Sequence, residues 1–321
     1  MRVCPTDRLS VGIQLPVQAL SSRFADEWEH DASVGDMISI AEAADRAGLF
    51  YVAVCDHVAV PRVDAEAMGT TWFDTIATLG LLAGRTHRVR LLSHVYIPAY
   101  RHPLQVAKAF ATLDRLSAGR VILGVGAGHV LGEFEVLGAD HRRRGALLDE
   151  SIAAISAALV DEFPDVDGDT WSFAHAGVGP RPVQQPRPPV WIGGSSPAAI
   201  RRVGRLGDGW LPQGTPLADI PAALEIIVAE AETAGRGDEP LDIGANGPLV
   251  HVGDPPGHIE GDRRFITGDP ERVAAALGRW TDAGVDHVQV AFRGARSAQE
   301  WCDQIERFGD EVLPLLGKED R

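Results

Sequence analysis

Two adjacent residues in the first quarter of the chain have side chains suited to proton transfer. Asp56 and His57 follow the apolar run 51–54 and Cys55. Imidazole titrates near neutral pH, so a histidine at a strand end can act as a general acid or base, and a neighbouring polar group can fix its tautomer. The pair predicts a proton donor and acceptor at His57, oriented by Asp56. The alternative is that Asp56 caps the next turn and His57 is an ordinary surface residue.

A glycine-rich turn later in the chain could bind an anion. Gly193, Gly194 and Ser195 follow the apolar run 190–192, and Pro197 then opens a helical pattern. Backbone N–H groups at the start of a helix attract phosphate, and glycines let it approach closely. We therefore expect these three residues to contact a phosphate. The alternative is an ordinary tight turn in which a serine caps the helix.

A second glycine cluster, residues 124–129, matches the dinucleotide-binding fingerprint only in part. The last glycine of that fingerprint is replaced by His129, and the cluster lies in the middle of the chain. Gly126, Ala127, Gly128 and His129 still follow a strand-like run. They are therefore candidate pocket residues, and His129 is a further candidate for catalysis.

Two kinds of hydrolysis are disfavoured. Metal-dependent barrel hydrolases usually carry a His-x-His pair at the end of the first strand, whereas residues 11–15 read VGIQL, so we expect no metal site. The chain has no Gly-x-Ser-x-Gly sequence, which would mark a nucleophilic serine. Cys55 lies beside an apolar strand, where a small buried side chain is its expected role.

The composition indicates a globular protein with a large core. Hydrophobic residues make up 45% of the 321 residues, and 45 acidic against 30 basic residues give a net charge of −15, which disfavours nucleic acid and anionic membranes as partners. No apolar run approaches the roughly 20 residues that span a bilayer. Three widely spaced cysteines and the lack of a signal-like apolar stretch in residues 1–11 predict a cytoplasmic location.

Short apolar runs alternate with helical patterns along the whole chain. The predicted strands are residues 11–15, 51–54, 89–95, 121–125, 190–192, 209–212, 242–252 and 288–292. The predicted helices are residues 34–47, 73–84, 103–116, 146–160, 197–206, 217–234, 270–283 and 298–316. Eight strand–helix pairs are what a (β/α)8 TIM-like barrel needs, and a doubly wound sheet is the alternative.

The barrel prediction places function at the carboxyl ends of the strands, where the loops converge. We expect a single domain over residues 1–321 with two insertions, at about residues 61–72 after the second strand and 161–189 before the fifth. The second insertion contains a possible hairpin around residues 171–173. Long insertions in barrels often cover the substrate.

The chain resembles the bacterial-luciferase-like superfamily, and especially its group of F420-dependent oxidoreductases. The matching segments run in order over about residues 9–315: VGIQLP at 11–16, VCDHV at 54–58, YRHP at 100–103, LDRLSAGRVILGVGAG at 113–128, PVWIGGS at 189–195, DGW at 208–210, GDPERV at 268–273 and AGVDHV at 283–288. The resemblance implies a TIM-like barrel that binds coenzyme F420, or alternatively FMN, at its mouth.

The resemblance also implies roles for individual residues. An Asp/Glu-His pair beside the redox ring corresponds to Asp56 and His57. A non-proline cis peptide that supports the ring corresponds to the segment Ser93, His94 and Val95. The cofactor phosphate would lie at the turn 193–195, and because F420 is polyanionic we expect arginines at the mouth, with these candidates: Arg62, Arg101, Arg201 and Arg293.

One residue departs from the pattern. Sugar-phosphate dehydrogenases of this group carry a catalytic glutamate where this chain has His129. Oxidation of a sugar phosphate is therefore not expected. The resemblance implies hydride transfer between C5 of the deazaflavin and a small organic substrate, with His57 exchanging the proton. The alternatives are an FMN-dependent monooxygenase and a cofactor carrier without turnover. The family also implies a homodimer.

Overall fold

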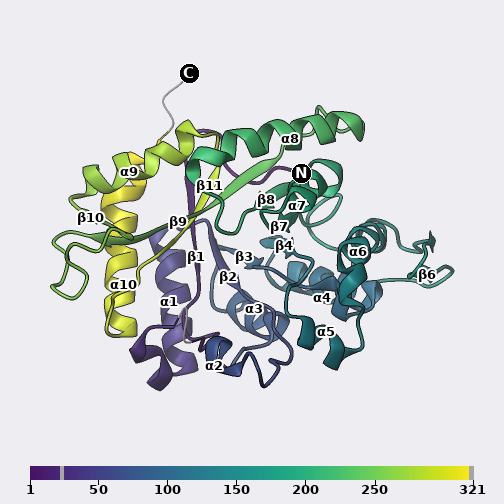
Figure 1. The fold of residues 1–321 in the computed structure, drawn as a ribbon, viewed down its shortest axis with the longest axis horizontal. Helices are drawn as coiled ribbons and strands as arrows, with labels where there is room; N and C mark the ends of the chain where they lie inside the picture. The colour runs from purple at the N-terminus through teal and green to yellow at the C-terminus, as the bar shows by residue number, and fades with distance from the viewer. Residues whose placement is uncertain (22–24, 318–321) are drawn as a thin grey trace.

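The computed structural model describes residues 1–21 and 25–317 and contains a closed barrel of eight parallel strands (Figure 1). The barrel strands are β1 (Ser10–Gln14), β2 (Tyr51–Val54), β3 (Arg90–Ser93), β4 (Val121–Val125), β7 (Val190–Gly193), β8 (Gly209–Leu211), β9 (Asp242–Val252) and β11 (His287–Ala291). Each strand pairs in parallel with its neighbours, and the pairing of β8 with β9 closes the ring. The predicted TIM-like barrel is confirmed.

The predicted strands agree with the observed ones to within a few residues, and one strand was missed. β10 (Phe265–Gly268) pairs in parallel with the far half of β9 and lies outside the barrel. β9 has eleven residues and extends beyond the ring, so it can pair with an additional strand. Only two of its four residues, Phe265 and Ile266, are apolar, so no apolar run reveals this strand.

Helices surround the barrel. The long ones are α1 (Val34–Ala47), α3 (Thr75–Ala83), α4 (Pro103–Leu116), α6 (Arg144–Val160), α7 (Pro197–Leu206), α8 (Ile220–Thr233), α9 (Pro270–Asp282) and α10 (Ala298–Arg307). Two short helices, α2 (Ala65–Met68) and α5 (Leu131–Leu137), were not predicted. The last predicted helix was too long, because α10 ends at Arg307 and continues as a π-helical turn (Phe308–Val312) and a 3-10 turn (Leu313–Leu315).

The core has two layers because successive side chains of a strand point to opposite faces. In β2, Val52 and Val54 pack outward against the helices, whereas Tyr51 and Ala53 pack inside the barrel. The inner layer also contains Trp191, and all five side chains are completely buried. The barrel is therefore a packed core and not a channel.

Large rings fill the end of the barrel where the strands begin, and glycines on adjacent strands make room for them. His287 stacks on Trp191 with ring centroids 4.1 Å apart, and Tyr51 meets both rings edge-on. A Cβ atom at Gly12 would lie 2.3 Å from the Tyr51 ring, and one at Gly244 would lie 2.4 Å from the His287 ring. These two positions must remain glycine for the rings to fit.

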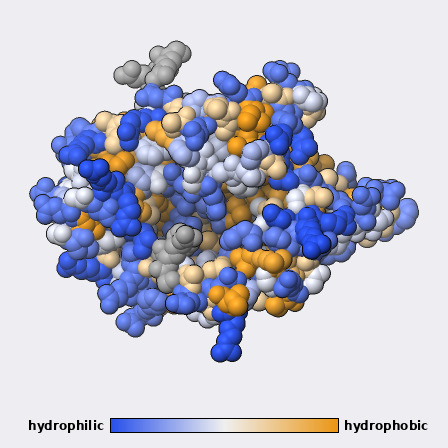
Figure 2. Space-filling model, in the orientation of Figure 1, coloured by the Kyte–Doolittle hydropathy of each residue, from blue (hydrophilic) through white to orange (hydrophobic). Residues whose placement is uncertain are grey.

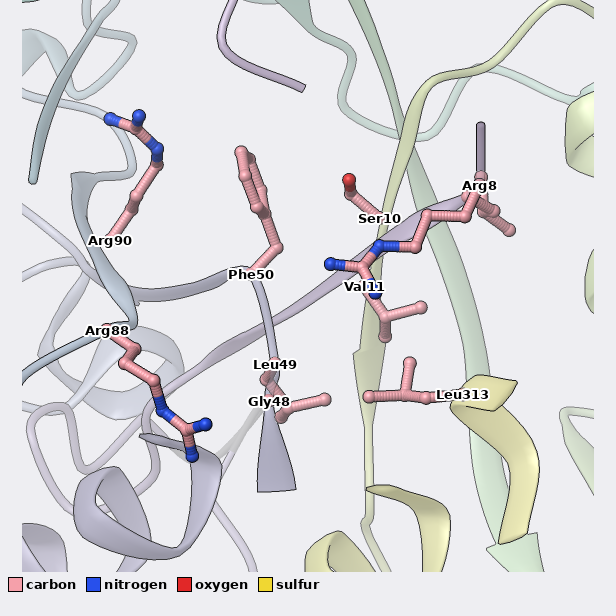
Figure 3. A pocket seen from close by; sticks show the side chains of 10 residues that line it. Arg8, Ser10, Val11, Gly48, Leu49, Phe50, Arg88, Arg90 and Leu313 are labelled. Carbon is pink, nitrogen blue, oxygen red and sulfur yellow. The ribbon is translucent and has the colours of Figure 1, made fainter. Parts of the chain in front are cut away.

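The amino-terminal segment covers the end of the barrel where the strands begin. The N–H groups of Val3 and Cys4 donate to Asp242, and Arg2 forms an ion pair with Asp286 at 2.7 Å. A cavity of about 240 Å³ remains beside this segment, at the starts of β1, β2 and β3. Figure 3 shows its lining residues, with Arg8 and Ser10 on one side of Phe50 and Arg90 on the other.

The segment before the fifth barrel strand forms the expected hairpin. β5 (Val166–Asp167) and β6 (Ser172–Phe173) are antiparallel, and the hairpin projects away from the barrel in Figure 1. The segment after β2 behaves differently, because Trp72 forms an isolated bridge with Ala19 and so folds back over the barrel. Of the two insertions, the loop after β2 is the one that contributes residues to the cavity at the mouth, among them Met68 and Trp72.

On the face seen in Figure 2, hydrophobic side chains occur in small groups among hydrophilic ones. Within residues 1–21 and 25–317, no helix has the length and apolar character needed to cross a bilayer.

Two buried histidines make the fold sensitive to acid. Burial lowers the pKa of His94 to about 4 and that of His287 to about 3. Both values lie below the unfolded value of about 6.5, so the stability that these residues contribute is fully present above pH 6.5 and is lost as the pH falls toward the folded values.

We predict that protonation of His287 in the unfolded chain costs about 2 kcal/mol of unfolding free energy between pH 7 and pH 5. The variant His287→Phe keeps a ring on Trp191 but cannot titrate, so its loss of stability over this interval should be smaller by that amount. Urea unfolding followed by tryptophan fluorescence at both pH values measures the difference. Equal losses in the two proteins would contradict a buried neutral imidazole.

Candidate active site at the mouth of the barrel

A cavity of about 1610 Å³ occupies the mouth of the barrel, where the strands end. Nearly all the predicted site residues line it: Asp56, His57, His94, Val95, Gly126, Ala127, Gly128, His129, Gly193, Gly194 and Ser195. Ser93 is the exception. It is completely buried, and its hydroxyl donates to the carbonyl of Gly124 and accepts from the N–H of the same residue. Ser93 therefore joins β3 to β4 and does not face the cavity.

His57 is held by a glutamate that is distant in sequence. Its Nδ1 atom lies 2.9 Å from the Glu133 carboxylate, whose other oxygen accepts the N–H groups of Val58 and Ala59. Tyr100 donates its hydroxyl to the same carboxylate at 3.2 Å. One buried carboxylate therefore fixes both the His57 ring and the backbone that follows it.

The charge on Glu133 follows from these contacts. Burial acts to raise the pKa of the carboxyl, but the hydrogen bonds from His57, Ala59 and Val58 outweigh it and leave the pKa below its ordinary value. An ionised carboxylate can only accept hydrogen bonds, so Nδ1 of His57 must carry a proton. The neutral ring then has an unprotonated Nε2 available to the cavity.

Asp56 differs from its predicted role, because its carboxylate does not contact His57. It forms a two-pronged ion pair with Arg101 at 2.6 and 2.8 Å and accepts the N–H of Ile97 at 2.9 Å. The Arg101 guanidinium also lies over the Tyr96 ring, 4.2 Å from its centroid. Asp56 therefore anchors the segment after β3 to the end of β2, and Glu133 takes the orienting role.

Two rings flank His57 at the cavity. Trp72 lies 4.4 Å from His57 between ring centroids, and His129 lies 6.1 Å away, nearly perpendicular. Burial, together with repulsion from His57, lowers the pKa of His129. His129 is therefore a mostly neutral neighbour of His57, in a position to touch what enters the cavity.

Val95 is one of the apolar side chains that line the cavity. The peptide bond between His94 and Val95 is cis, as the family resemblance implied. A Cβ atom at Gly126 or Gly193 would lie 2.5 or 2.7 Å from the Val95 side chain, so both glycines make room for it. Gly193 thus serves Val95, in addition to the phosphate role predicted for it.

The turn after β7 offers fewer backbone donors than predicted. The N–H of Gly194 donates to the carbonyl of Leu211, and the Ser195 hydroxyl is bonded to Gln213. Ser196 caps α7 by accepting the N–H of Ala199. The N–H groups of Ser195 and Ser196, at the start of α7, are therefore the candidate anion donors.

Basic side chains line the cavity, and one of them, Arg293, was among those predicted. Arg144 and Arg202 lie there, at the start of α6 and on α7, and Arg202 is paired with Asp149. Of the predicted arginines, Arg293 lines the cavity and pairs with Asp26 at 2.7 Å. Arg62 and Arg201 do not line it, and Arg101 belongs to the Asp56 ion pair.

The cavity fits a flat aromatic cofactor with a phosphate. Val95 offers an apolar surface for a ring, and His57 lies on the same cavity, where a substrate could meet both. The start of α7 with Arg144 offers the positive potential that a phosphate needs. Cys55 adds no nucleophile, because burial raises the pKa of its thiol to about 12.

The chain is similar to three proteins of known function or structure. An F420-dependent glucose-6-phosphate dehydrogenase of Amycolatopsis mediterranei is 29% identical over 323 residues, which cover 88% of this chain and 94% of the relative. A coenzyme F420 dependent tetrahydromethanopterin reductase from Methanopyrus kandleri has a TM-score of 0.72 at 21% identity, covering 96% of this chain and 99% of the other.

The third is the monooxygenase RslO1 from Streptomyces bottropensis, with a TM-score of 0.77 at 22% identity, covering 95% of this chain and 99% of the other. At these identities the two solved structures show the fold alone. The family model described as luciferase-like monooxygenase matches residues 18–260, about three quarters of the sequence. The protein therefore belongs to the luciferase-like monooxygenase family.

Proposed function

We propose that the protein is an F420-dependent oxidoreductase that transfers a hydride between the cofactor and a small organic substrate. The curated relative named above uses F420, and the cavity fits a ring with a phosphate. The observation that carries the proposal is His57, which faces this cavity and is fixed by the buried Glu133 carboxylate.

The deazaflavin ring supplies the carbon, C5, that accepts or donates the hydride. The chain supplies the proton transfer. Because Glu133 holds the proton of His57 on Nδ1, Nε2 can take a proton from a substrate hydroxyl as the hydride leaves. The resulting imidazolium is stabilised by the Glu133 carboxylate beside it. In the reverse direction the same ring returns the proton.

The residues around His57 limit the size and shape of the substrate that can reach it. Trp72 and His129 narrow the cavity on two sides of the imidazole. His129 stands where the family resemblance places the catalytic glutamate of sugar-phosphate dehydrogenases, so we propose a substrate other than a sugar phosphate. The cytoplasmic location and the homodimer remain predictions.

An FMN-dependent monooxygenase is the second candidate, since a monooxygenase shares this fold. Titration of the purified protein with F420 and, separately, with FMN, followed by quenching of tryptophan fluorescence, distinguishes the two. Micromolar or tighter binding of F420 alone supports the proposal. Binding of FMN alone would favour the FMN-dependent monooxygenase. Binding of neither cofactor would overturn both candidate functions.

We predict that His57→Ala lowers turnover about 100-fold or more, which is the usual size of a lost general acid–base group. Affinity for F420 should change by no more than several-fold, because the substitution leaves Val95 and the start of α7 intact. Steady-state kinetics and the fluorescence titration measure the two quantities. Unchanged turnover would remove His57 from the mechanism.

We predict that Glu133→Gln lowers turnover about 10-fold or more, because a neutral amide stabilises the imidazolium less well and can reverse the tautomer of His57. Affinity for F420 should change by no more than several-fold, because Val95 and the start of α7 remain intact. Tyr100→Phe removes one neutral donor from the same carboxylate and serves as the control. Turnover in Glu133→Gln equal to that of the wild type would contradict the positioning role.

Arg144→Gln should weaken F420 binding about 10-fold by removing a charge-assisted contact to phosphate. The deazaflavin chromophore without its phosphate-bearing tail should bind as it does to the wild type. Arg142→Gln, which removes the same charge from an exposed residue that does not line the cavity, is the matched control. An equal loss in both variants would indicate long-range electrostatics and not a phosphate contact.

A further inference from the structure

The loops after β1 and β2 together cover one side of the active-site cavity. Their backbones are joined, because the N–H of Leu20 donates to the carbonyl of Thr71 and the N–H of Phe73 donates to that of Gln18. We call the apolar residues with which these loops line the cavity the apolar cover: Leu15, Pro16, Ala19, Ala67, Met68 and Trp72. The hydrogen bonds between the loops hold this cover in place above the barrel.

The polar side chains that line the same side of the cavity are bonded within the protein. The amides of Gln14 and Gln18 donate to Sγ of Cys55 at 3.0 and 3.6 Å. The Glu29 carboxylate accepts two backbone N–H groups, and the Ser21 hydroxyl donates to a backbone carbonyl. These groups therefore have little hydrogen-bonding capacity left for a substrate that lies under the apolar cover.

Apolar side chains continue outside the cavity. Four exposed ones form what we call the apolar rim, two on the loop after β2 and two on α5: Val58, Val63, Leu131 and Val136. The loop and the helix touch, because a Cβ atom at Gly132 would lie 2.7 Å from the side chain of Pro61. Figure 2 shows hydrophobic side chains between α2 and α5, just below the hollow at the centre of this face. Neighbouring exposed apolar groups mark a binding surface.

His57 lies where the cover and the rim meet. Trp72 of the cover contacts its ring, and Val58 of the rim follows it in the chain. The cavity of about 1610 Å³ is larger than the roughly 300–1,000 Å³ of a common ligand pocket. A cofactor ring against Val95 with its phosphate near Arg144 therefore leaves room for a second molecule under the cover.

We propose that the apolar cover and the apolar rim bind the hydrocarbon body of the substrate. The substrate is then an alcohol, or the matching carbonyl compound, whose only polar group near His57 is the one that reacts. This inference rests on the proposed function and names the substrate class. Affinity comes from removing methylene groups from water, whereas a polyhydroxylated substrate would place hydroxyls against groups that cannot bond them.

The test measures how affinity depends on chain length. The probes are the straight-chain secondary alcohols from butanol to octanol, and an octanediol whose second hydroxyl lies in mid-chain. Each is titrated by calorimetry into the F420-saturated protein and into the protein alone. Met68→Gln changes the cover and Leu131→Asn changes the rim. Leu116→Asn is the matched control, because Leu116 is 64% exposed, against 53% for Leu131, and lies at the end of α4, outside the cavity.

We expect the affinity of the wild type to rise about two- to fourfold for each added methylene, with a negative heat-capacity change of binding. The octanediol should bind about fivefold more weakly than octanol. Met68→Gln and Leu131→Asn should each lower the affinity for octanol about 3- to 10-fold, and the loss in Leu131→Asn should diminish as the chain shortens. Leu116→Asn should leave the affinity for octanol within about twofold of the wild type.

Two results would overturn the inference. One is an affinity of the wild type that does not rise with chain length. The other is an equal loss of octanol binding in Leu131→Asn and Leu116→Asn, which would indicate adsorption to any exposed apolar side chain. If Met68→Gln does not fold, Leu131→Asn decides alone, since it changes an exposed residue. Failure of the wild type to bind F420 or FMN would instead reject the proposed function, and the series on the protein alone would still test the two apolar surfaces.

Discussion

The contacts of the Glu133 carboxylate join the two loops on which the site depends. Glu133 lies on α5, after β4, and its partners His57, Val58 and Ala59 lie after β2, about 75 residues earlier. With Glu133 ionised, the loop after β2 cannot move away from α5 without leaving a buried charge unpaired, which would be strongly unfavourable. The fixed position of the His57 ring and the fixed position of the loop after β2 therefore have the same cause.

Asp56 and Glu133 show how two buried carboxylates can have separate tasks. Asp56 is saturated by Arg101 and Ile97, so it has little capacity left for a substrate and fixes the segment that follows Val95. Glu133 instead holds the His57 ring and the backbone that follows it. Adjacent residues at the end of β2 therefore differ in their contacts: Asp56 fixes the segment that follows Val95, and His57 lines the cavity.

The barrel could be predicted from the sequence because local periodicity determines it, whereas the pairing within the site could not. Tyr51–Val54 and Val121–Val125 are apolar runs whose bounds match the observed strands. The partner of His57 was assigned to Asp56 because the two are adjacent in sequence, yet a side chain beside another on a strand end points elsewhere. One sequence signal for α5, which carries Glu133, was available: Gly138. A glycine often ends a helix in the left-handed conformation, as Gly138 does here.

The same reasoning explains why the glycines were only partly interpreted. A glycine at a strand end predicts a close approach, but not what approaches. At Gly126 and Gly193 the approaching group is Val95 of this chain, and at Gly12 it is the Tyr51 ring. At these three positions the barrel therefore uses glycine to admit its own side chains.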